Sequence, residues 1–247
     1  MARYIALTCE ALARPVYAAA ATSPHTVSVR LLKQGLHNRP KSLRRTLQDE
    51  IEAITADQCD GVLLAYGLCG TATVGVAARH VPVVLPRAHD CITLYLGSRE
   101  RYNEEFLRHP GTYWYSVDFL ERQDQDAAVS LGAAGIADEE EQYEQYIRKY
   151  GQETADMLME EIRSWSRHYT RAAFIDLELG DGSFYAERAQ AKAAKEGWTY
   201  EPMKGDWRLM RMLIHGQWPD EEFLTVSPGH AIAQSYKDSI VKAVPAT

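Results

Sequence analysis

The chain has 247 residues, with 34 acidic and 27 basic side chains and a formal net charge of -7. This acidic balance argues against general binding to nucleic acid or to anionic lipid. No apolar run approaches the roughly 20 residues of a membrane span, and Glu10 interrupts the N-terminus before an apolar core of signal-peptide length. We therefore expect a cytoplasmic protein, whose four cysteines are more typical of thiols or metal ligands than of disulfides.

The first half of the chain alternates between strand and helix patterns. Apolar and β-branched runs predict the strands, and apolar residues at helical spacing predict the helices between them. The expected order is strand 3–9, helix 10–21, strand 25–32, helix 40–54, strand 61–69, a helix opened by 70–75, a strand within 81–91, helix 92–107 with Gly97 and Ser98 inside it or at a break, and an extended stretch after 109–115. This alternation predicts a mostly parallel sheet with right-handed crossovers.

The rest of the chain predicts a helical connector and a second α/β set. Residues 124–150 are polar and helical in character, and 153–169 has the pattern of an amphipathic helix. Strand patterns at 171–177, 198–203 and 223–227 alternate with helix patterns at 183–196 and 206–215. We expect an N-terminal α/β half at 1–122, a helical connector at 123–170 and a C-terminal α/β half at 171–247. The two halves would be Rossmann-like, with a cleft between them for a small substrate.

Three cysteines follow three of the predicted strands. Cys9 ends the first strand, Cys69 ends the strand that begins at Gly61, and Cys91 follows the strand within 81–91. Parallel α/β sheets bind ligands at the carboxyl ends of their strands. The sequence therefore predicts that these three thiols share one site, whereas Cys59, which stands before a strand, has no predicted role.

The shared thiols suggest a metal centre. His89 is one residue from Cys91, so Cys9, Cys69, Cys91 and His89 form a Cys3His set that suits zinc. Four bound side chains would make a closed structural site, and three would leave a position open for chemistry. Three cysteines could instead hold an iron–sulfur cluster. Two alternatives stay open: Cys91 acts as a nucleophile with His89 as its base, or the thiols and the histidine simply pack in the core.

Four neighbouring residues are further candidates. Asp90 could act with His89 in catalysis by orienting that ring or a bound water, or it could cap the following helix. Arg87 could bind a carboxylate or phosphate of a cofactor, or form a surface ion pair. Gly70 and Thr71 open a predicted helix whose free N–H groups could face the same ligand. The glycine-rich fingerprints of dinucleotide and triphosphate sites are missing from the sequence, which argues against NAD or ATP.

Four stretches of the sequence resemble a known family. They are YGLCG at 66–70, RAHDCITLYLGS at 87–98, HPGTYW at 109–114 and KGD at 204–206. The family is bacterial and archaeal, and it is known only as a conserved domain of unknown function. Its members are often encoded beside corrinoid-dependent methyltransferases, corrinoid proteins and their reductive activators. The resemblance therefore implies a role near methyl-group or corrinoid metabolism.

Together these observations predict a metal-thiolate protein of one-carbon metabolism. The expected cofactor is zinc or an iron–sulfur cluster, with a corrinoid as a further candidate, and the expected substrate is a small methylated molecule. A corrinoid protein or a methyltransferase is the expected protein partner. Zinc enzymes that move methyl groups from corrinoids to thiols also use a His-x-Cys pair and a distant Cys, although on a different barrel fold. The alternative is an accessory protein that binds a corrinoid, a metal or a methylated intermediate without turning it over.

Overall fold

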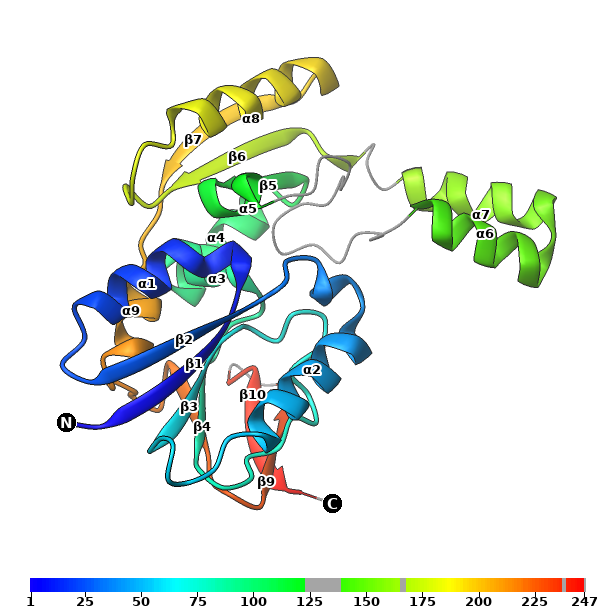
Figure 1. Ribbon diagram of the computed structural model, residues 1–247. Helices are drawn as coiled ribbons and strands as arrows, with labels where there is room; N and C mark the ends of the chain where they lie inside the picture. The colour runs from blue at the N-terminus through cyan, green and yellow to red at the C-terminus, as the bar shows by residue number, and fades with distance from the viewer. Residues whose placement is uncertain (123–138, 165–167, 237–238, 247) are drawn as a thin grey trace.

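The computed structural model describes residues 1–122, 139–164, 168–236 and 239–246. In this part of the chain the fold is mixed α/β, with helices packed against two largely parallel sheets (Figure 1). The predicted fold class is therefore confirmed. No helix of the described residues is long and apolar enough to cross a membrane.

The larger sheet has five strands in the order β2-β1-β3-β4-β8. The strands are β1 (Arg3–Cys9), β2 (Thr26–Leu32), β3 (Gly61–Ala65), β4 (Val83–Pro86) and β8 (Phe223–Val226). The first four run parallel, and β8 pairs antiparallel with β4. Every residue of β3 and β4 is buried, because a parallel sheet is covered on both faces.

Helices cover both faces of this sheet. Figure 1 shows α1 (Ala13–Ala21) and α9 (Arg208–Ile214) on one side and α2 (Pro40–Glu52) on the other. The short helix η1 (Glu10–Leu12) links β1 to α1, and η2 (Leu36–Asn38) precedes α2. Pro40 is at the first position of α2, where its missing N–H costs nothing.

The smaller sheet has three parallel strands, β5 (Thr112–Ser116), β6 (Arg171–Asp176) and β7 (Thr199–Lys204). Helix α8 (Ser183–Glu196) packs against β6 and β7. Because β5 comes from the predicted N-terminal half and β8 from the predicted C-terminal half, the two sheets do not coincide with those halves.

The remaining elements include a separate sheet of two antiparallel strands, β9 (His230–Gln234) and β10 (Val241–Pro245). The others are α3 (Cys91–Leu96), α4 (Arg99–Arg108), α5 (Val117–Glu121), α6 (Glu139–Tyr150) and α7 (Gln152–Ser164). Helices α6 and α7 pack together as a hairpin that projects beside the two sheets (Figure 1). They lie within the predicted helical connector, whose residues 123–138 and 165–167 are outside the described residues.

Two helix predictions are decided by the structure. The helix expected to open at 70–75 does not form: residues 70–75 make turns, because Gly70, Thr71 and Gly75 have positive φ angles that interrupt a right-handed helix. The expected helix 92–107 has the break at Gly97 and Ser98 that the sequence allowed, and it forms two helices, α3 and α4. Gly97, with φ of 78°, ends the first, and the Ser98 side chain caps the second.

Candidate functional site

The three predicted cysteines meet at the carboxyl edge of the larger sheet. Cys9 is the last residue of β1, Cys69 follows β3 and Cys91 opens α3 directly after β4. Since β1, β3 and β4 are adjacent and parallel, their ends lie side by side. All three thiols line one cavity.

The cavity is a concave pocket that is open to solvent. It holds about 490 Å3 together with its open mouth. Apolar side chains form most of its wall, and its polar or soft side chains are Cys9, Cys69, Cys91, Tyr66, His37, Asp90 and Lys33. Concave, mostly apolar sites with a few polar groups are typical of ligand binding.

Backbone hydrogen bonds fix the loops that carry two of the thiols. The N–H of Leu68 donates to the Ala88 carbonyl at 2.8 Å, and the N–H of Cys69 donates to the His89 carbonyl at 2.9 Å. These bonds extend the β3–β4 pairing past the ends of both strands. They therefore hold Cys69 beside the start of α3.

The loop at Cys69 has an unusual backbone. Cys69, Gly70 and Thr71 have φ angles of 46°, 62° and 72°, which places three successive residues in the left-handed region. Two of them carry a Cβ, so the conformation costs of order 1–3 kcal/mol for each. A hydrogen bond from Arg44 to the Thr71 carbonyl, 3.0 Å long, helps to hold it.

The surroundings of the three thiols keep them protonated. Burial raises the pKa of Cys9 to about 11, and the nearby carboxylates of Glu10 and Asp118 add to the rise. Burial and Asp90 raise the pKa of Cys69 and of Cys91, with a further contribution from Cys9 at both thiols and from Cys69 at Cys91. Negative charge on these thiols is therefore disfavoured in the absence of a cation.

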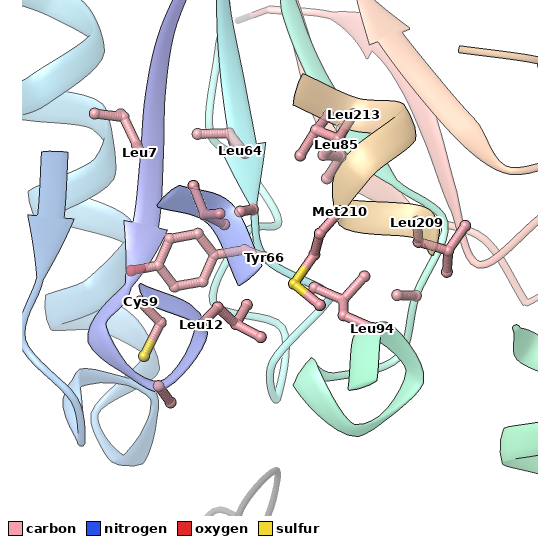
Figure 2. Packing of buried hydrophobic residues seen from close by; sticks show 14 of the residues in the cluster. Leu7, Cys9, Leu12, Leu64, Tyr66, Leu85, Leu94, Leu209, Met210 and Leu213 are labelled. Atoms are coloured by element: carbon pink, nitrogen blue, oxygen red, sulfur yellow. The ribbon is translucent and has the colours of Figure 1, made fainter. Parts of the chain in front are cut away.

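The hydroxyl of Tyr66 is buried in the same cavity without a hydrogen bond. The residue is 3% exposed, and its hydroxyl makes no hydrogen bond with any described residue. Figure 2 shows the ring beside Cys9 at the end of β1. A buried unsatisfied hydroxyl costs about 1–3 kcal/mol, so such a group calls for an explanation.

Asp90 is the N-cap of α3. One of its oxygens accepts the N–H groups of Ile92 at 2.9 Å and Thr93 at 3.3 Å, and the other accepts the Tyr102 hydroxyl at 3.2 Å. Burial raises the pKa of Asp90 to about 6, although these donors act in the opposite direction. The helix-capping alternative is therefore present in the structure, with the carboxylate also in the cavity wall.

His89 and Arg87 lie away from the lining of the cavity. The His89 ring is exposed and stacks on Tyr102, with ring centroids 5.8 Å apart. Partial burial and Arg99 lower the pKa of His89. Arg87 donates to the carbonyls of Asp220 at 2.7 Å, Phe223 and Ser239 at 3.1 and 3.0 Å, and Val241. Its guanidinium thus fastens the C-terminal segment to β4.

Of the two predicted cofactor-binding residues after Cys69, only one is in the cavity wall. Gly70 lines the cavity, and Thr71 is exposed beside it. The helix N-terminus that they were expected to open is absent from the described backbone, so their N–H groups belong to a turn.

The described residues contain no group of three or more His, Cys, Asp or Glu side chains already arranged to hold a metal ion. The thiols therefore share a cavity without a preformed coordination geometry. Metal binding at this place would require side-chain rotations toward a common point.

Comparison with known proteins identifies the family. Residues 31–214 match the model of a family described as "Protein of unknown function (DUF1638)". The chain belongs to this family. No curated protein matches the chain. No solved structure matches it either. The matched part of this DUF1638 chain includes Cys69 and Cys91, and it begins after Cys9.

A second cavity of this DUF1638 protein lies between its two sheets. It is lined by Arg14, Tyr95, Asp118 and residues at and just after the end of β6, and it holds about 210 Å3 together with its open mouth. Asp118 accepts the N–H of Arg14 at 3.0 Å and the Tyr95 hydroxyl at 3.4 Å. Tyr95 also donates to the carbonyl of Ala11. Burial raises the pKa of Asp118 to about 6.

Sequence reasoning missed two residues of the thiol cavity. Tyr66 lies in the run that ends at Cys69, and its side chain has no predicted role. His37 lies in the segment between β2 and α2, which the sequence pattern predicts as a turn. The position of His37 in the sequence could have indicated its place in the cavity. It follows a strand of the same parallel sheet, and ligands bind at the carboxyl ends of such strands.

Proposed function

We propose that Cys9, Cys69 and Cys91 bind one zinc ion or an iron–sulfur cluster, and that this centre serves methyl-group transfer on a small substrate. The observation that carries the proposal is the convergence of three thiols, from three parallel strands, on one cavity. Three thiolates are a usual ligand set for zinc and for an iron–sulfur cluster with one open position.

The electrostatics of the cavity favour a cation. Burial is the largest cause of the raised pKa of all three thiols, and Glu10, Asp90 and Asp118 each add to the rise for at least one of them. A metal ion would reverse this, because binding of a soft cation releases the thiol protons and compensates the buried negative charge. Thiols with raised pKa values are poor nucleophiles when free, which makes the metal-free thiol enzyme the weaker hypothesis.

The chain's own residues would have distinct roles around such a centre. Asp90 fixes the start of α3 and so the position of Cys91, and Tyr66 supplies a buried hydroxyl donor toward the thiols. The metal, when bound, would lower the pKa of an incoming thiol or water and so prepare a methyl acceptor. The apolar wall would exclude bulk water from the substrate.

The volume of the cavity limits what it can enclose. The volume of about 490 Å3 includes open solvent at the mouth, so the enclosed space is smaller still. A corrinoid is far larger than this space, so we infer that any corrinoid would be carried by a partner protein and approach the mouth of the cavity. The link to corrinoid metabolism rests on the family resemblance.

A non-catalytic accessory role is the second candidate. The observation that favours it is the state of the predicted acid–base pair, since Asp90 has both oxygens engaged and His89 lies outside the cavity wall. Such a protein would hold a metal or a methylated intermediate without turning it over.

Metal analysis of anaerobically purified protein tests the proposal. We expect about one equivalent of zinc or about four of iron, and loss of most of that metal in Cys69→Ser and Cys91→Ser. Cys59→Ser is the matched control, because Cys59 is a buried free thiol before β3, at the opposite end of that strand from Cys69. Wild-type protein that carries and binds neither metal would overturn the metal proposal.

A methyl-transfer assay separates the two candidate functions. Methylcobalamin and a small thiol acceptor are incubated with the metal-loaded protein, and the absorbance of the corrinoid is followed. Catalytic demethylation that Cys69→Ser abolishes supports methyl transfer. A bound but unchanged methylcobalamin spectrum would favour the accessory role.

A further inference from the structure

Four neighbouring strands of the larger sheet each end at, or lead to, a side chain that can bind a metal. In spatial order the strands are β2, β1, β3 and β4, all parallel. They are followed by His37, Cys9, Cys69 and Cys91, and all four of these side chains line the same cavity. The sheet thus presents three thiols and one imidazole along a single edge.

His37 occupies the position that the sequence predicted for His89. It lies on η2, which the chain reaches through a turn at Gly35 with φ of 87°. Gln34 anchors this turn, because its N–H donates to Glu10 at 3.0 Å and its side-chain amide donates to the Phe119 carbonyl at 3.0 Å. The turn is therefore fixed over the end of β1, next to Cys9.

His89 has a different environment. Its ring is exposed on the outer side of the loop after β4 and stacks on Tyr102 of α4. Its backbone carbonyl accepts the N–H of Cys69, which fixes the loop while the side chain stays outside the cavity wall.

Tyr66 gives independent support for a ligand at this edge. Its hydroxyl is buried in the cavity wall and makes no hydrogen bond with any described residue. A metal-bound thiolate accepts hydrogen bonds, so a loaded centre would supply the partner that this phenol lacks.

We propose that His37, rather than His89, is the fourth protein ligand of the centre, which makes the set Cys9, Cys69, Cys91 and His37. This inference rests on the proposed metal function and specifies its coordination. The set is Cys3His, a common tetrahedral set for zinc. Because His37 lies on a half-buried turn while the thiols lie at strand ends, its position is the one that a substrate would take.

Cobalt substitution tests the assignment. Metal-free protein is titrated with Co²⁺ without oxygen, and the ligand-field and thiolate charge-transfer bands are recorded for wild type, His37→Gln and His89→Gln. We expect His37→Gln to weaken Co²⁺ binding by at least the roughly 10–100-fold that loss of a supporting group costs, with a shift of the ligand-field bands. His89→Gln is the matched control and should match wild type.

A rescue variant addresses structural damage. His37→Cys keeps a soft ligand at the same place, so it should restore tight binding with an additional thiolate charge-transfer contribution. An unchanged His37→Gln spectrum, or weakened binding in His89→Gln alone, would overturn the assignment of His37 and leave the three-thiol proposal standing. Wild-type protein that binds no Co²⁺ would overturn the metal proposal itself.

Discussion

The two cavities of this protein differ in whether their buried polar groups are hydrogen-bonded. In the cavity between the sheets, the Asp118 carboxylate and the Tyr95 hydroxyl are both hydrogen-bonded, to each other and to the backbone. In the thiol cavity, the equally buried hydroxyl of Tyr66 makes no hydrogen bond with the described residues, and three thiols share the space.

The difference separates a structural contact from a candidate binding site. Buried polar groups in folded proteins are almost always hydrogen-bonded. The partnered groups around Asp118 therefore need no ligand, and they join the two sheets. The unpartnered Tyr66 hydroxyl marks the thiol cavity as the place where a missing partner belongs.

The largest expected change in stability comes from replacing glycines beside the two cavities with alanine. A Cβ at Gly67 would lie 2.7–2.9 Å from backbone atoms of Asp90 and Ala88, which cannot move independently of the β4 loop. We expect Gly67→Ala to destabilise the protein by about 4 kcal/mol. At Gly205 two of the three nearest atoms belong to side chains of Leu177 and Ile175, so Gly205→Ala should cost about 2 kcal/mol.

Urea unfolding of both variants measures this difference. Gly197→Ala is the control for loss of glycine freedom alone, because its φ is 73° and nothing lies within 4 Å of the added Cβ. Equal destabilisation of Gly67→Ala and Gly205→Ala would show that the thiol-bearing loops are less rigid than their contacts indicate.

Asp118 should make stability depend on pH. Burial raises its pKa from the ordinary 3.8 to about 6 in the folded protein, so the folded state binds more protons than the unfolded state between these values. Stability should therefore fall as pH rises from about 4 to 6, by roughly 2–3 kcal/mol.

Asp118→Asn should make this part of the profile less steep, and the remaining slope would come from Asp90, whose pKa burial also raises to about 6. The measurement is the free energy of unfolding by urea at several pH values, with wild type alongside. A variant that keeps the full wild-type slope between pH 4 and 6 would show that Asp118 does not titrate there, and that the cavity between the sheets does not hold a neutral carboxyl.

The smallest expected changes in stability come from two tyrosine variants. They test the contrast between the two cavities because their effects should have opposite signs. Tyr95→Phe removes a donor to Ala11 and Asp118, so it should destabilise by about 1–2 kcal/mol. Tyr66→Phe removes an unpartnered hydroxyl, so it should stabilise the metal-free protein by about 1 kcal/mol.

The same Tyr66→Phe variant should weaken metal binding about 10-fold, because a loaded centre would lose a hydrogen-bond donor. Thermal or urea unfolding of metal-free protein gives the first effect, and competition with a chelator gives the second. Destabilisation of the metal-free protein by Tyr66→Phe would mean that the hydroxyl already has a partner, and the contrast between the cavities would fail.

The sequence by itself determined the strands of the two larger sheets and the edge at which the three cysteines meet, although it predicted neither β9 nor β10. Alternating apolar runs and helical patterns carry that information locally, and in a parallel sheet the carboxyl ends of neighbouring strands lie at one edge by geometry. The convergence of Cys9, Cys69 and Cys91 therefore follows from short-range pattern and a general rule of connection.

Only the tertiary structure decided which histidine lines the cavity and how the two sheets divide the chain. One residue separates His89 from Cys91, yet the His89 ring is exposed and stacks on Tyr102. His37, which follows β2, lines the cavity because β2 pairs with β1. Side-chain direction and the pairing of β8 with β4 depend on contacts between residues far apart in the sequence. Such contacts leave no periodic signal in a single chain, because each is set by packing that forms only when distant segments meet.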